Sequence, residues 1–221
     1  MGYHLLPIPV SLALIGTYMV ARNRNDLKKT AIIQPLTTLV SIVIAAMSLL
    51  SPASNPSYTA WILVGLGLCL LADVFNIDMT NDNILYAAIG VFVIAYLEYA
   101  ITFTRFNGFQ PEDLWVGILF ILIYIFLMRL YWKKLGNFKI PVLIYGLVMP
   151  FMVTRAISTL FGDTFSTLSA ILVSIGSFML FLGDVEYGIH RFHTPIKFSI
   201  GPILYAGGQL LIALSCPYFL P

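Results

Sequence analysis

The sequence has little charge: Asp, Glu, Lys and Arg make up only 10% of its 221 residues, and the formal net charge is +2. An ordinary soluble domain carries about 25% charged residues, so the composition excludes that class. So small a net charge also gives no electrostatic basis for binding nucleic acid. Cysteine is scarce as well. Cys69 and Cys216 both fall in apolar stretches, which indicates buried small side chains rather than a disulfide or a metal site.

Several motifs of soluble enzymes and secreted proteins are also missing. The three histidines, at 4, 190 and 193, show no metal-ligand spacing within an apolar segment, so no metal site and no cofactor are predicted. No nucleophile elbow and no Ser or Cys in a triad context is present. The first 21 residues lack a basic start and a small-residue cleavage motif, so this segment is expected to remain as a membrane helix.

Hydrophobic residues are abundant instead, at 59% of the chain, and the mean hydropathy is +0.91. A membrane-spanning helix needs about 17–25 apolar residues. By this measure the sequence predicts an all-α integral membrane bundle of about eight transmembrane helices in a single domain, 1–221. The expected spans are residues 5–21, 31–50, 58–77, 84–104, 114–132, 139–154, 166–188 and 198–216. Pro150 is expected to break the sixth.

The basic residues are distributed unevenly between the connections. The odd-numbered connections and their borders hold ten of the twelve: Arg22, Arg24, Lys28, Lys29, Arg129, Lys133, Lys134, Lys139, Arg191 and Lys197. The even-numbered connections and their borders hold only Arg105 and Arg155. Because cytoplasmic loops are enriched in Lys and Arg, this bias predicts that both termini lie outside the cytoplasm. The short connections favour a bacterial inner membrane.

Two acidic residues interrupt otherwise apolar spans: Asp73 in LLADVF and Asp184 in FLGDVEYGI. An acid inside a membrane helix is costly and usually functional. Both predicted spans run toward the cytoplasm, with Asp184 in about the last turn, so the two carboxylates are expected at similar depth and able to meet. Each Asp precedes Val and a tyrosine-bearing span, which would fit two parallel four-helix halves.

A carboxylate pair suggests acid–base chemistry. Two neighbouring carboxylates repel, so one is expected to keep its proton while the other is ionised, giving a general acid and a general base. Five polar residues near the pair by depth or helical spacing are predicted to bind substrate: Gln34, Asn76, Tyr187, Tyr205 and Gln209. Two other interpretations stay open: the acids serve only as interhelical contacts or as a cap near the helix end, or they form a proton relay in a transporter.

Six motifs in order resemble one known family: QPLTT (34–38), LLADVF (70–75), FVIAYLEYAITF (92–103), VMPFMVTRA (148–156), GSFMLFLGDVEYGIHRF (176–192) and LYAGGQLLIALS (204–215). Together they resemble the YhhN-like membrane family of lysoplasmalogenases. The resemblance implies an eight-helix hydrolase that acts on a lysophospholipid in the bilayer. It would cleave the vinyl-ether bond of lysoplasmalogen without a cofactor, giving a fatty aldehyde and glycerophosphoethanolamine or glycerophosphocholine.

The resemblance also implies site residues. The acidic positions of the family fall on Asp73 and Asp184, and its recurrent polar positions on Gln34, Tyr205 and Gln209. This chain departs from the family at Gln34, where Lys is common, and at Tyr96, where His is usual. These departures keep two alternatives open: a proton-coupled small-molecule transporter, and a lipid-binding membrane protein without catalytic activity.

Overall fold

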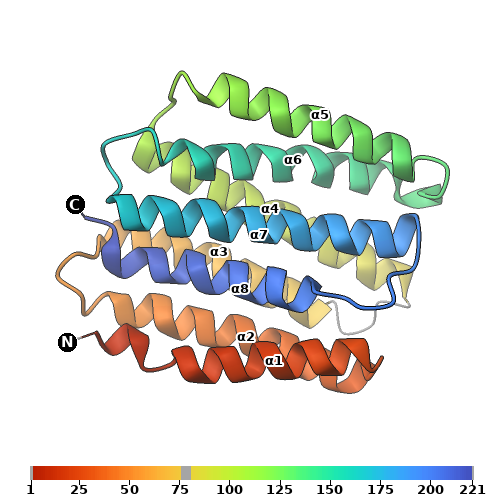
Figure 1. The fold of residues 1–221 in the computed structure, drawn as a ribbon, viewed down its shortest axis with the longest axis horizontal. Coiled ribbons are helices and arrows are strands. Elements are labelled where there is room, and N and C mark those ends of the chain that lie inside the picture. Colours follow the sequence, from red (N-terminus) through yellow and green to blue (C-terminus); the bar gives the residue numbers. More distant parts are fainter. Residues whose placement is uncertain (1, 76–80, 221) are drawn as a thin grey trace.

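A computed structural model describes residues 2–75 and 81–220, and the regular structure in these residues is helical throughout. Short 3-10 helices at Tyr3–Leu5, Gly136–Phe138 and Cys216–Tyr218 accompany the main helices. The eight α-helices (Figure 1) are α1 (Ile8–Asn23), α2 (Leu27–Ser48), α3 (Pro56–Phe75), α4 (Asp82–Asn107), α5 (Asp113–Tyr131), α6 (Lys139–Ser158), α7 (Thr167–Phe192) and α8 (Gly201–Ser215). The predicted all-α architecture is confirmed.

Seven helical segments of the described chain are long and apolar enough to cross a membrane. The protein is therefore a multi-pass membrane protein. The eighth helix, α8, has only 15 residues, and at 1.5 Å rise per residue it reaches about 22 Å. It begins at Gly201, later than the predicted 198, because Pro202 occupies its first turn, a position where proline favours the start of a helix.

Pro150 does not break the sixth span. α6 runs continuously from Lys139 to Ser158 with Pro150 inside it and buried, so the expected end near 154 is wrong. Proline removes one backbone N–H, so the Gly146 carbonyl loses its helical donor, and a packed bundle tolerates one such loss. The Thr154 hydroxyl adds a local hydrogen bond to the Pro150 carbonyl at 2.8 Å.

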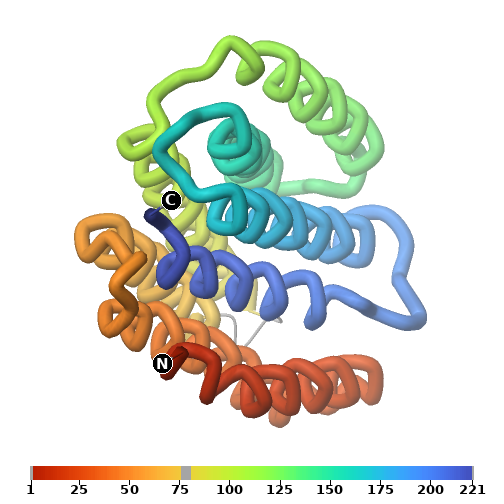
Figure 2. Tube along the Cα trace, turned by 60° about the vertical axis from the view of Figure 1, so that its left-hand side comes forward, coloured from red at the N-terminus to blue at the C-terminus, as the bar shows by residue number. Residues whose placement is uncertain are grey.

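The helices form one bundle with both ends of the chain at the same end of the molecule (Figures 1 and 2). α2 packs against α1, α3 and α8, α4 packs against α3 and α6, and α7 lies between α6 and α8. α5 packs mainly on α6 and buries only Phe120 and Tyr131. Most of its surface therefore faces outward.

α7 and α8 approach each other closely because glycines meet between them. A Cβ added at Gly208 would lie 2.6 Å from the Gly176 carbonyl oxygen, which is closer than side chains tolerate. Small residues allow such approaches between membrane helices. This contact fixes α8, which carries Tyr205, beside α7, which carries Asp184.

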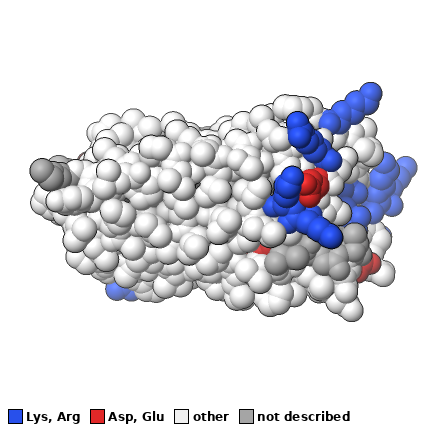
Figure 3. Space-filling model, turned by 90° about the horizontal axis from the view of Figure 1, so that it is seen from below, with Lys and Arg blue, Asp and Glu red and all other residues white. Residues whose placement is uncertain are grey.

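The charges gather at one end of the bundle. Figure 3 shows nearly all of the visible Lys and Arg side chains at the end opposite the chain termini, where α1–α2, α5–α6 and α7–α8 are connected. The long middle of this face is free of charge. Asp26 caps α2 there by accepting from the Lys29 backbone N–H, which lowers the pKa of its carboxyl group. The uneven charge distribution predicted from the sequence is thus present in three dimensions.

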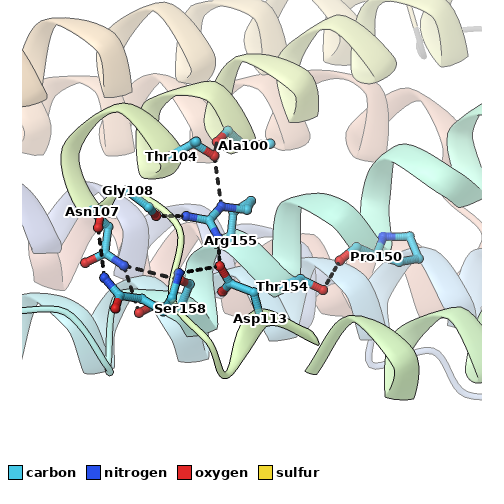
Figure 4. Close-up of polar contacts among 10 residues, drawn as sticks. Ala100, Thr104, Asn107, Gly108, Asp113, Pro150, Thr154, Arg155 and Ser158 are labelled. Atoms are coloured by element: carbon cyan, nitrogen blue, oxygen red, sulfur yellow. Dashed lines mark hydrogen bonds and ion pairs between the residues drawn. The ribbon is translucent and has the colours of Figure 1, made fainter. Parts of the chain in front are cut away.

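At the opposite end, a buried arginine fastens the α4–α5 connection to α6 (Figure 4). Arg155 is 1% exposed, and its guanidinium pairs with the Asp113 carboxylate and donates to the Gly108 carbonyl. Its Nε donates to Thr104 Oγ1 at 2.8 Å, and the group lies over the Phe109 ring at 4.5 Å. Each of the three guanidinium nitrogens donates a hydrogen bond, and the charge is paired with Asp113. Arg155 therefore stabilises the fold.

Candidate active site

A cavity of about 660 Å³ lies at the basic end of the bundle, within the size range of small-ligand sites. Its two sides differ in polarity. On α1, α2, the connection between them and the α7–α8 connection the wall includes Arg22, Asn23, Asn25, Thr30, Gln34 and Lys197. On α4, α5 and α6 it includes Phe92, Leu127, Met128, Val142 and Met149, and α7 supplies both Phe181 and the polar Asp184, Glu186, His190 and Arg191. The cavity therefore suits a ligand with one charged and one apolar part.

Asp184 on α7 belongs to the cavity wall and is partly exposed. Two tyrosine hydroxyls donate to its Oδ2: Tyr145 of α6 at 2.5 Å and Tyr96 of α4 at 2.9 Å. Among the described residues, none donates to its Oδ1. One carboxylate oxygen is thus held by the protein while the other is free for a ligand.

Asp73 on α3 is enclosed, at 1% exposure, and does not line the cavity. Its Oδ1 accepts from Gln34 Nε2 at 2.7 Å and from the Tyr205 hydroxyl at 2.6 Å. Its Oδ2 accepts from the Thr38 hydroxyl at 2.5 Å. Gln34 in turn accepts from the Tyr18 hydroxyl at 2.9 Å. Gln34, Tyr18 and Tyr205 line the cavity, so Asp73 reaches it only through these side chains.

The two carboxylates have separate partners, and no hydrogen bond joins them among the described contacts. Phe92 lies between their tyrosines, with ring centroids 6.0 Å from both Tyr96 and Tyr205. α3 is described as far as Phe75, and α7 continues eight residues beyond Asp184, to Phe192. The expectation that Asp184 lies in the last turn of its helix is therefore wrong, because α7 extends a full turn beyond the predicted 188.

The surroundings of the two acids nevertheless correspond. Each Asp accepts from a side chain 39 residues earlier, Gln34 for Asp73 and Tyr145 for Asp184. If α1–α4 and α5–α8 are taken as two halves, each Asp also accepts from a tyrosine on the last helix of the other half. Tyr205 on α8 donates to Asp73, and Tyr96 on α4 donates to Asp184. α2 packs against α8 as α6 packs against α4. This arrangement fits two four-helix halves that exchange a tyrosine at each acid.

The other residues predicted for the site lie in different places. Tyr187 lines the cavity, as do Gln34 and Tyr205. Gln209 is fully buried and away from the cavity, with no hydrogen-bond partner for its amide within the described chain. Asn76 lies outside the described residues. The structure thus brings three of the five predicted polar residues to the cavity wall.

Sequence reasoning missed Thr38 and Tyr145 as partners of the acids and Tyr18 as the partner of Gln34. Thr38 lies one helical turn after Gln34 and could have been found from that i, i+4 spacing. Tyr145 could have been found only by noticing that it precedes Asp184 by the interval that separates Gln34 from Asp73. Within the described ranges, no three His, Cys, Asp or Glu side chains are grouped to hold a metal ion.

The sequence matches one protein-family model over most of its length. The YhhN family model matches residues 29–216, which include both acids and all their hydrogen-bond partners. The chain belongs to the YhhN family. No curated protein and no solved structure matches it.

Proposed function

We propose that this YhhN-family protein is a membrane hydrolase that cleaves the vinyl-ether bond of a lysoplasmalogen. The products would be a fatty aldehyde and glycerophosphoethanolamine or glycerophosphocholine. The observation that carries the proposal is that Asp184 lines a cavity whose wall also holds cations and apolar side chains, and that both tyrosine hydroxyls bind its Oδ2 and not its Oδ1. In a lysoplasmalogen the vinyl ether joins the hydrocarbon chain to the charged head. A lipid lying across the cavity would bring this bond to Asp184.

The chemistry needs a proton donor and water. The carboxylic acid of Asp184 donates a proton to the β-carbon, the π electrons form the new C–H bond, and the ether oxygen stabilises the resulting oxocarbenium ion. Water adds to the cationic carbon and gives its proton to the Asp184 carboxylate, leaving a hemiacetal. The hemiacetal hydroxyl then loses a proton as the glycerol oxygen gains one, and the C–O bond breaks to release the aldehyde. The overall reaction adds one water and transfers no electrons to or from another molecule, so the proposed steps use no redox cofactor.

The hydrogen bonds around the acids support this role. The Tyr96 and Tyr145 hydroxyls would stabilise the carboxylate that Asp184 becomes after donating its proton. Asp73 has a different role in the proposal because it does not face the cavity. It holds Gln34 and Tyr205 in the wall, where they would position the lipid and the water.

Tyr145→Phe is expected to lower kcat for aldehyde release by roughly 10–100-fold with little change in KM, because the lost hydrogen bond to a charged group acts mainly after proton transfer. Steady-state kinetics of the purified variant would check this. Tyr124→Phe is the matched control: Tyr124 also lines the cavity, but its hydroxyl points to the Leu143 carbonyl at 3.4 Å. Equal kcat values for the wild type and Tyr145→Phe would show that this hydrogen bond is not used.

The proposal is tested by measuring aldehyde release from ethanolamine and choline lysoplasmalogens by the purified protein in detergent. Aldehyde formation in proportion to protein would support it. Folded protein that binds these lipids without releasing aldehyde would instead favour the non-catalytic lipid-binding alternative. Proton-driven uptake by vesicles without hydrolysis would favour a transporter.

We further propose that the basic end faces the cytoplasm of a bacterial inner membrane, with both termini outside. The cluster of Lys and Arg at one end supports this orientation. A membrane-impermeant thiol reagent is expected to label a cysteine replacing Gly2 in intact cells, but one replacing Asn25 only after lysis. The opposite labelling pattern would reverse the orientation.

A further inference from the structure

A slot in the bundle lies between α5 and α7. The two helices meet at two levels: Phe120 packs against Phe181 with ring centroids 5.2 Å apart, and Tyr131 donates to the Val185 carbonyl at 3.2 Å. Between these contacts the α5 side chains face the cavity rather than α7. We call this space, lined by Leu127 and Met128 and bounded by those two contacts, the α5–α7 slot.

The slot belongs to the apolar side of the cavity. Leu127 and Met128 line the cavity together with Val142 and Met149 of α6. The cations of the cavity are on other elements: Arg22 on α1, Lys197 on the α7–α8 connection and Arg191 near the end of α7. A single-chain amphiphile therefore gains most by placing its hydrocarbon part in the slot and its charged part among the cations. Within the described chain, Arg22 and Lys197 form no ion pair, so both are available to an anion.

α5 also gives a hydrocarbon chain a direct route from the bilayer. It buries two residues, lies on the outside of the bundle and packs mainly on α6 (Figure 2). Phe126, next to Leu127 in sequence, is 64% exposed on the outward surface. A single helix, α5, therefore separates the slot from the outer surface of the bundle on this side.

We propose that the α5–α7 slot holds the hydrocarbon chain of a single-chain phospholipid whose phosphate lies toward Arg22 and Lys197. The choice of lipid class rests on the proposed function. The deep end of the slot is closed by Met149 and Phe181, which are 3% and 4% exposed. These two residues set the longest chain that fits, and Leu127 sets the width.

The first test maps where the chain lies. Full-length protein is illuminated with lysophosphatidylethanolamine that carries an ester-linked chain and a terminal diazirine, and labelled peptides are identified by mass spectrometry. The ester linkage has no vinyl ether to hydrolyse, so binding is measured without turnover. Label that excess unmodified lysophospholipid displaces is expected in 124–131, 145–150 and 178–185. Displaceable label confined to 18–34, or label that no competitor displaces, would overturn the proposal.

A pair of neighbouring substitutions tests the slot independently. Leu127→Trp fills the slot and is expected to lower displaceable labelling by a stearoyl probe roughly tenfold, with a smaller loss for a lauroyl probe. Phe126→Trp changes the adjacent, outward residue and is expected to leave both unchanged. Equal labelling in the two variants would contradict the assignment. Labelling in the slot without aldehyde release would contradict the proposed hydrolase function and support the hydrocarbon-chain site. Aldehyde release with the label elsewhere would support the hydrolase function and contradict the hydrocarbon-chain site.

Discussion

Asp184→Asn is expected to lower aldehyde release by about 10²–10⁴-fold, the usual contribution of a general acid or base. The amide has nearly the same size, and its oxygen still accepts from Tyr145 and Tyr96, but it has no acidic proton to give. The variant should therefore stay folded and should still bind the ester-linked lysophospholipid. Single-turnover aldehyde release, measured beside lipid binding, checks both parts.

Glu186→Gln is the matched control for this change. Glu186 lies two residues further along α7, also lines the cavity and is also partly exposed. It lies beside Gly201 at the start of α8 rather than beside the two tyrosines. Its neutralisation is expected to leave kcat within a few-fold of the wild type. An active Asp184→Asn, or an equal loss in both variants, would remove Asp184 from the role of proton donor.

Arg155→Met is expected to lower the free energy of unfolding by about 3–5 kcal/mol, the usual effect of removing one partner from a buried ion pair. The change removes the cation from the Asp113 carboxylate, which keeps the Gln110 backbone N–H at 2.8 Å as a donor, and it leaves the Gly108 carbonyl without the Arg155 donor. The side chains of Arg155 and Asp113 are 1% and 15% exposed. Methionine keeps much of the apolar contact of the side chain. Thermal or denaturant unfolding in detergent, followed by tryptophan fluorescence, would measure the loss.

Arg105→Met is the control at the same end of the bundle. Arg105 is exposed and lies 5.4 Å from the ring centroid of Trp61, a contact expected to contribute about 0.5–1 kcal/mol. The double variant Arg155→Met with Asp113→Leu is expected to recover part of the loss, because no charge is then left unpaired. A double variant no more stable than Arg155→Met alone would show that the ion pair is not the cause.

The fold class and the position of the acids could be predicted from the sequence because both depend on local composition. Long apolar segments require helices in a bilayer, and an acid inside such a segment is conspicuous whatever its partners are. The helix ends were predicted less well. α6 passes through Pro150 and α7 reaches Phe192, because packing in the bundle rather than hydropathy determines these ends, and α8 starts only at Gly201, where Pro202 occupies its first turn.

The sequence by itself determined that this is a helical membrane protein, polarised by its basic residues, with Asp73 and Asp184 as two acids within its membrane helices. Only the tertiary structure decided that Asp184 faces the cavity while Asp73 is enclosed, and that Tyr145 and Tyr96 hold Asp184. The physical reason is distance along the chain: these hydrogen bonds join residues 39, 88 and 132 positions apart. Such partners are set by which helices pack together, and hydrophobic periodicity within one helix carries no information about that choice.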